Sequence, residues 1–151
     1  MLRTILTDGN PMLRKKCHPV TRFDRRLTDL LEDLEETLKE SEGVGLAAPQ
    51  IGILRRVAVI DIGEGKLELI NPVIIGTEGE QEWQEGCLSI PGKRGLTRRP
   101  EKVRVRAQDR NGDFFEKEGE GLLAVALCHE LDHLDGKLYT DIVEGPLWED
   151  E

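Results

Sequence analysis

Short β-prone runs fill the middle of this chain, and a segment with helical periodicity stands on each side of them. The runs are RRVAVID at 55–61, KLELI at 66–70, PVIIGTEG at 72–79, KVRVRAQD at 102–109 and DFFEKEG at 113–119. Between the last two, Asn111 and Gly112 form the strongest short-range signal for a β-hairpin. The order helix, strands in hairpins, helix predicts an α+β fold with mainly antiparallel short strands.

The two helical segments differ in character. The first spans 24–41, with Asp24 as a candidate N-cap and Gly43 just past its expected end. Its leucines recur at helical spacing: Leu27, Leu30, Leu31, Leu34 and Leu38. The second spans 120–134 and is apolar before it reaches the letters HELDH. We therefore expect an N-terminal amphipathic helix and a second helix that carries HELDH.

Composition limits the class of protein. No linker, internal repeat or low-complexity tract divides the 151 residues, so we expect residues 1–151 to form a single domain. No apolar run approaches the roughly 18 residues of a membrane span, and the N-terminus lacks the apolar region of a signal peptide. We expect a soluble, cytoplasmic chain with no membrane partner and three reduced cysteines. The net charge of −9 argues against a surface that coats nucleic acid.

Two of the three histidines, His129 and His133, lie one turn apart in the second helix. A helix turns about 100° per residue, so the two imidazoles share one face, flanked by Glu130 and Asp132. Two such imidazoles can bind one metal ion, and Glu130 is then placed to take a proton from a metal-bound water without being a ligand. The simpler alternative is a partly exposed helix that happens to carry polar residues, which the scarcity of histidine disfavours.

A catalytic metal site also needs a third protein ligand and an open position. No histidine follows Gly136, so a downstream ligand would be Asp141, Glu144 or a terminal acid. Upstream, Cys87 in QEGCLSIPG precedes an expected Pro-Gly turn and would complete a site of two histidines and one thiolate. A lone cysteine is more often a small buried apolar residue than a ligand. The residues alone therefore leave the third ligand open.

Three stretches together resemble the signature motifs of the peptide deformylases, in the order and spacing of that family. They are GVGLAAPQIG from Gly43, EGCLSIPG from Glu85 and HELDHLDG from His129. The resemblance covers nearly the whole chain, and it implies a metal-dependent hydrolase. Its reaction would be removal of the N-formyl group from the initiator methionine of nascent polypeptides at the ribosome.

The resemblance also implies roles for individual residues. The ligands of one divalent metal ion per chain, Fe(II) in the active form with Zn as a possible substitute, would be Cys87, His129 and His133. A metal-bound water would attack the formyl carbonyl, with Glu130 as general base and then general acid. Gln50 and the backbone N–H of Leu88 would donate hydrogen bonds to the oxyanion.

A methionine side chain needs an apolar pocket, and residues in and near the motifs are candidates for it. Val44, Trp83 and Val125 are the apolar candidates, although ordinary core residues have the same character. Gly45 lets an extended backbone pass close to a substrate peptide. Arg94 follows the second motif closely enough to meet a substrate carbonyl.

Other residues are candidates for supporting the site or depart from the pattern of the family. Asp132 is a candidate partner for an arginine such as Arg99, and Glu85 for bracing its own loop. Cys128 stands where the family more often has glutamine. Longer relatives dock on ribosomal RNA through a basic C-terminal helix, whereas the residues after Gly136 include one lysine and five acids. We therefore expect no direct nucleic-acid binding by this tail.

Two other functions use the same helix. A zinc peptidase with HExxH would cleave unformylated internal peptide bonds and would be indifferent to Cys87→Ser. A catalytically silent, metal-stabilised binding domain would hold metal without turnover, and Glu130→Ala would leave it unchanged.

Overall fold

Two helices and two antiparallel sheets make up residues 1–150, which are the residues that this computed structural model describes. The helices are α1 (Arg25–Ser41) and α2 (Leu122–Leu134), and three 3-10 turns are η1 (Pro11–Arg14), η2 (Ala48–Ile51) and η3 (Tyr139–Asp141). The strands are β1 (Gly45–Ala47), β2 (Val57–Ile60), β3 (Leu67–Glu78), β4 (Gln81–Cys87), β5 (Ile90–Arg99), β6 (Lys102–Gln108), β7 (Phe114–Glu120) and β8 (Trp148–Glu149). Within residues 1–150, no helix is long and apolar enough to cross a membrane.

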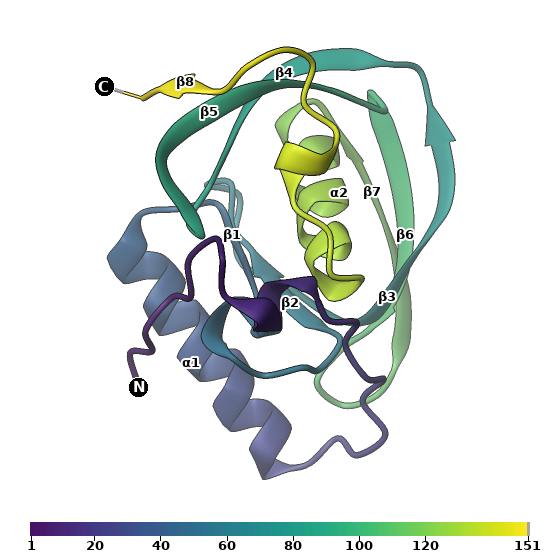
Figure 1. Ribbon diagram of the computed structural model, residues 1–151. Coiled ribbons are helices and arrows are strands. Elements are labelled where there is room, and N and C mark those ends of the chain that lie inside the picture. The colour runs from purple at the N-terminus through teal and green to yellow at the C-terminus, as the bar shows by residue number, and fades with distance from the viewer. Residues whose placement is uncertain (151) are drawn as a thin grey trace.

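The sheets confirm the predicted α+β class. The larger has the strand order β1-β2-β3-β6-β7, and the smaller has the order β4-β5-β8. The predicted hairpin joins β6 to β7, with Gln108 opposite Phe114 and Gly112 at a φ of 86° in the turn. Figure 1 shows α2 enclosed by strands of both sheets, so the metal-binding helix lies inside the fold.

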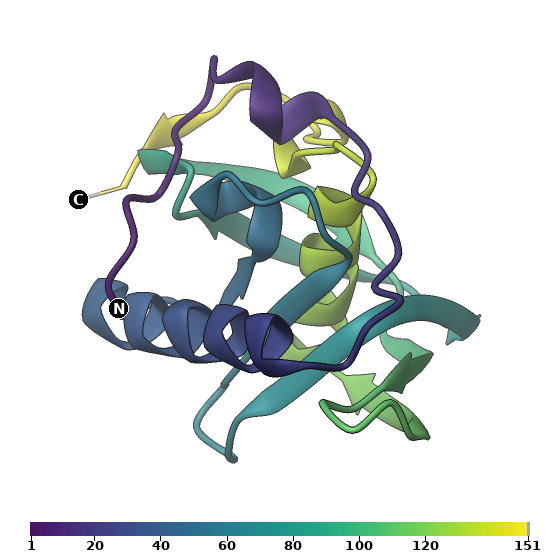
Figure 2. The same ribbon diagram turned by 90° about the horizontal axis from the view of Figure 1, so that it is seen from below.

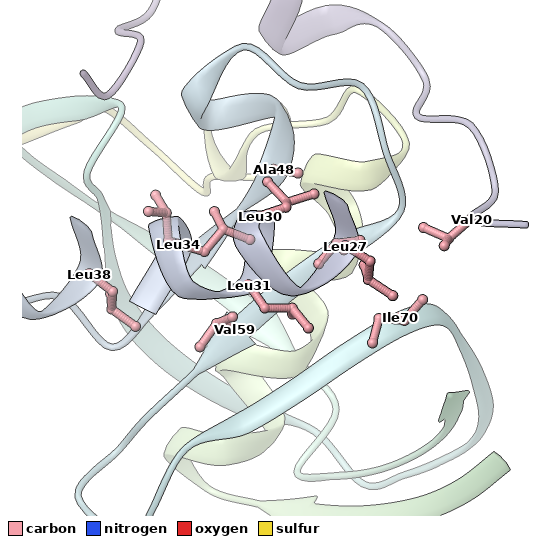
Figure 3. Packing of buried hydrophobic residues seen from close by; sticks show 11 residues of the cluster. Val20, Leu27, Leu30, Leu31, Leu34, Leu38, Ala48, Val59 and Ile70 are labelled. Carbon is pink, nitrogen blue, oxygen red and sulfur yellow. The ribbon is translucent and has the colours of Figure 1, made fainter. Parts of the chain in front are cut away.

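Helix α1 forms where its leucine repeat predicts it. The Asp24 side chain caps it by accepting the Leu27 N–H at 3.3 Å. The leucines of the repeat are all buried, and Figure 3 shows them beside Val59 of β2 and Ile70 of β3. Burial of this stripe fixes α1 against the larger sheet.

Strand β2 is buried on both faces because the two helices cover opposite sides of it. Its residues alternate: Val57 and Val59 pack in the cluster with α1, whereas Ile60 packs in the cluster with α2. Figure 2 shows α1 lying along one side of the larger sheet and α2 on the other. This layering brings β1, which pairs with β2, against α2, where Gly45 lies beside Glu130.

Helix α1 ends at Ser41, with Gly43 just past its end as predicted. Glu42, rather than Gly43, takes the left-handed conformation after the helix, with a φ of 59°. Gly43 lies against the Leu88 side chain, since a Cβ on it would lie 2.8 Å from the Leu88 Cδ1 and would displace that side chain. The absence of a side chain at Gly43 therefore lets the chain approach the turn after β4 closely.

The strands differ from the prediction in three places. The runs 66–70 and 72–79 form one strand, β3, because Asn71 adopts a φ of 52° at an irregularity and the pairing continues beyond it. Strands β1, β4, β5 and β8 were not predicted, since they are too short or too polar to show apolar alternation. The Pro-Gly turn expected after Cys87 is also wrong: the chain turns at 88–89, and Pro91 and Gly92 lie within β5.

Gly136 ends α2 in a position that only glycine fits. Its φ is 75°, and a Cβ there would lie 2.5 Å from the carbonyl oxygen of Arg14. We expect Gly136→Ala to lower the free energy of unfolding by about 2–4 kcal/mol, because left-handed strain and a clash with backbone add. Gly9→Ala, at a φ of 98° with no atom within 4 Å of the added Cβ, is the matched control and should cost about 1–2 kcal/mol. Equal urea midpoints for the two variants would contradict the steric argument.

Candidate active site

Three side chains from two elements converge on one point. Cys87 ends β4, and His129 and His133 lie one turn apart on α2. The Nε2 atoms of the two histidines are 3.2 Å apart, and the Cys87 Sγ lies 3.4 Å from the His133 Nε2. All three ligand atoms lie within 4.8 Å of one another. The third ligand that the residues alone left open is therefore Cys87.

These separations fit a tetrahedral metal ion. Metal bonds of about 2.05 Å to nitrogen and 2.3 Å to sulfur at tetrahedral angles place two nitrogens about 3.3 Å apart and nitrogen and sulfur about 3.6 Å apart. The observed distances of 3.2 and 3.4 Å are close to both values. Three protein ligands leave one coordination position for water or substrate.

The alternative ligands are engaged elsewhere. Asp141 forms an ion pair with Arg14, and Glu144 with Arg98. Cys128 packs in the apolar cluster around α2, where burial raises the pKa of its thiol to about 11. It is therefore a protonated apolar side chain at neutral pH, and it is not part of the ligand group.

A buried ion-pair network holds His129 in place. The His129 Nδ1–H donates to Glu85 at 2.8 Å, which leaves Nε2 as the atom that faces the metal position. Arg99 donates two hydrogen bonds to Glu85, at 2.8 and 3.0 Å, and a third to Asp132 at 2.7 Å. Burial alone would raise the pKa of Glu85, but its bonds with His129 and Arg99 outweigh burial and lower it to about 2. The expected partnership of Asp132 with Arg99 is confirmed.

Glu130 lies beside the ligand group with one oxygen free of partners. Its side chain is buried, and within residues 1–150 no group of the protein hydrogen-bonds to its Oε1. Burial raises the pKa of its carboxyl group to about 7. A Cβ on Gly45 would lie 2.5 Å from the Oε2 of Glu130, so only glycine at 45 leaves room for this carboxylate. Glu130 is thus available to exchange protons with a bound molecule.

The raised pKa makes a prediction for the metal-free protein. Since the pKa of Glu130 is about 7 in the folded state and ordinarily 4.5, its contribution to stability is present below pH 4.5 and is lost as the pH rises through 7. Glutamine has no proton to lose, so Glu130→Gln does not lose this stability. Its free energy of unfolding relative to that of the wild type should rise by about 3 kcal/mol between pH 4.5 and pH 8. Urea unfolding in a chelator at both pH values measures the gain. Glu64→Gln, at an exposed position, is the control, and a gain of the same size there would contradict the assignment.

Gln50 is held at the site by both ends of its amide. Its Oε1 accepts the Ala47 N–H at 2.9 Å, and its Nε2 donates to the Ser89 hydroxyl at 3.0 Å and, over a longer 3.7 Å, to the Cys87 Sγ. The Ser89 N–H also donates to that sulfur, at 3.4 Å. Leu88 lies between Cys87 and Ser89 in the turn and lines the same cleft.

The site opens into a cleft of about 540 Å³. Its lining includes every substrate-binding candidate from the sequence: Val44, Gly45, Trp83, Arg94 and Val125. Val44 is exposed, whereas Val125 is buried beside the helix. The lining also includes the segments 43–45 and 86–88, one from the first motif and one from the second.

Two residues at the site were missed by the sequence reasoning. Ser89 is fully buried with its hydroxyl on Gln50, and the Tyr139 ring stacks on His129 with centroids 6.1 Å apart. The presence of Ser89 within the second motif was the available signal, but nothing local indicates that its hydroxyl points inward. Tyr139 lies beyond the third motif, and only the packing of η3 brings it to the ring.

Comparisons with known proteins agree with this geometry. A family model described as Polypeptide deformylase matches residues 2–146. The curated peptide deformylase of Caldanaerobacter subterraneus subsp. tengcongensis is 57% identical over 142 residues, covering 94% of this chain and 89% of that protein. The peptide deformylase of Agathobacter rectalis is 53% identical over 146 residues, covering 97% and 92%. A crystal structure of a peptide deformylase from Legionella pneumophila superposes with a TM-score of 0.93 at 46% identity, over 95% of this chain and 87% of that one.

Proposed function

Since this chain belongs to the peptide deformylase family, we propose that it removes the N-formyl group from the initiator methionine of nascent polypeptides. One observation carries the proposal. The ligand atoms of Cys87, His129 and His133 lie together, and Cys87, His129 and Glu130, which has an unpartnered oxygen, line one cleft. These are the groups that hydrolysis of a small amide requires: a metal position, a buried base and access for a peptide.

We propose one divalent metal ion per chain, Fe(II) in the active form with Zn as a possible substitute, held by Cys87, His129 and His133. Thiolate and imidazole ligands suit both metals. When bound, the metal supplies a Lewis acid that activates water and polarises the formyl carbonyl.

The residues of the chain itself carry the proton and orient the substrate. Glu130 takes a proton from the attacking water and returns it to the departing amine, and a carboxyl pKa of about 7 suits both steps near neutral pH. Gln50 and the N–H of Leu88 donate to the developing oxyanion. The long contact of the Gln50 Nε2 with sulfur is the bond that an oxyanion would replace.

The cleft is suited to an extended formyl-methionyl peptide. Gly45 and its neighbours present backbone along one wall, while Val44, Trp83 and Val125 offer apolar contact to methionine. Arg94, which also lines the cleft, would meet the peptide beyond its first residue. We propose that residues 1–151 act as one catalytic domain in the cytoplasm on nascent chains at the ribosome, without binding nucleic acid directly, since the charge of −9 disfavours phosphate contacts.

Formate release tests the function. Protein purified anaerobically with Fe(II) should release formate from formyl-Met-Ala-Ser and leave acetyl-Met-Ala-Ser intact. Cleavage of internal bonds in unformylated peptides, unaffected by Cys87→Ser, would favour a zinc peptidase instead. No turnover by protein that holds one metal ion per chain would favour a binding domain.

A further inference from the structure

The C-terminal residues return to the edge of the peptide cleft. Strand β8 pairs antiparallel with β5, so that Lys93 lies opposite Glu149 and Arg94 opposite Trp148. One residue further, the Asp150 N–H donates to the Gly92 carbonyl at 2.9 Å. Figure 1 shows β8, in yellow, alongside β5 at the end of the chain.

Each basic residue of this part of β5 has an acidic partner from the C-terminal segment. Lys93 forms an ion pair with Glu149, and the Arg94 Nε donates to the Asp150 Oδ2 at 2.9 Å. A further Arg94 nitrogen donates to the Gln84 carbonyl at 3.0 Å. Since Glu149 already neutralises the charge of Lys93, Asp150 is the group that neutralises the charge of Arg94.

The Arg94–Asp150 pair lies close to the reaction centre. A Cβ on Gly86 would lie 3.6 Å from the Arg94 Cζ, so the guanidinium covers the residue that precedes the ligand Cys87. Arg94 and Asp150 both line the cleft that contains Glu130. Their side chains are 41% and 44% exposed, so a bound peptide can reach both charges.

We propose that Asp150 is a specificity-determining residue, which sets the preference of the enzyme for charged residues after formyl-methionine by its ion pair with Arg94. This proposal rests on the deformylase function proposed above. With Asp150 in place, the pair is neutral, and an acidic peptide gains little from Arg94 because Asp150 repels it. Without Asp150 this end of the cleft becomes positive and favours acidic peptides. Without Arg94 it becomes negative and favours basic ones.

The test compares three amidated peptides on the metal-loaded enzyme: formyl-Met-Lys-Lys, formyl-Met-Glu-Glu and formyl-Met-Ala-Ser. The measured quantity is the ratio of kcat/KM for the lysine peptide to that for the glutamate peptide. Asp150→Asn should lower this ratio about two- to fivefold, the range of an exposed ion pair, and Arg94→Gln should raise it. The change should lie in KM rather than kcat, and should largely vanish in about 1 M salt. Asp150→Glu should keep the ratio of the wild type.

Glu144→Gln is the matched control, because it removes one acid from the same segment outside the cleft lining. An unchanged ratio in Asp150→Asn, or an equal change in Glu144→Gln, would overturn the proposal. The neutral peptide separates the two claims. If formyl-Met-Ala-Ser releases no formate, the proposed function fails, whereas turnover with the same ratio in all variants rejects only the role of Asp150.

Discussion

Glu130→Gln is expected to reduce formate release at least about a hundredfold while the protein keeps its metal ion. Positioned acid–base groups contribute about 10²- to 10⁴-fold to catalysis, and the variant cannot accept a proton. Metal content should persist because the ligand group consists of Cys87, His129 and His133, with Glu130 beside it. Glutamine keeps the volume of the side chain, so the space that Gly45 leaves for it remains filled.

The measurement is kcat/KM on formyl-Met-Ala-Ser together with the metal content of each preparation. Asp135→Asn provides the control, because this acid at the C-cap of α2 pairs with Arg56 away from the cleft. It should keep nearly full turnover. Activity in Glu130→Gln within a few-fold of the wild type would show that another group transfers the proton.

The second large effect concerns the arginine behind His129. Arg99→Leu should lower the free energy of unfolding by about 3–5 kcal/mol, because it leaves the carboxylate of Glu85 buried without its main partner. The Arg99 and Glu85 side chains are only 6% and 2% exposed, so water cannot replace the lost bonds. Metal affinity should fall about 10- to 100-fold as well, since Glu85 orients His129.

Arg98→Leu is a close control for this variant. Arg98 precedes Arg99 on β5, but its pairs with Glu82 and Glu144 are about half exposed. Exposed pairs contribute at most about 1 kcal/mol, so Arg98→Leu should change stability little. Urea unfolding of the metal-free proteins separates the stability effect from metal loss. Equal destabilisation by both variants would show that removing the arginine of the buried Glu85–Arg99 pair costs no more stability than removing the arginine of exposed pairs.

The sequence predicted the elements whose apolar residues repeat with a clear period. The leucines of α1 and the hairpin at 111–112 are of this kind, because one face of each element is buried. Strands β4 and β5 escaped prediction, since they are short of apolar residues and are held by pairing with each other and, for β5, with β8 near the end of the chain. Such pairs join residues far apart in the sequence, which no local pattern reveals.

The residues of the candidate site are also of two kinds: some follow from a local pattern, and others depend on contacts with distant residues. Helical spacing alone places His129 and His133 on one face, and the structure confirms it. The choice of Cys87 depended on family resemblance, because the sequence does not show that Asp141 is engaged by Arg14. The role of Gly43 likewise depends on a contact with Leu88 across the fold. Residues that act through distant partners are therefore those that single-sequence reasoning identifies least well.

The contacts between β4 and α2 join two elements of different repeat length. Glu85 and Cys87 are two residues apart on β4, at an irregularity in its pairing with β5, while His129 and His133 are four residues apart on a helix, about 6.0 Å. Glu85 contacts the first histidine and Cys87 the second. Inserting or deleting a single residue in either element would separate both contacts at once. Change in these two segments is thus confined to substitution.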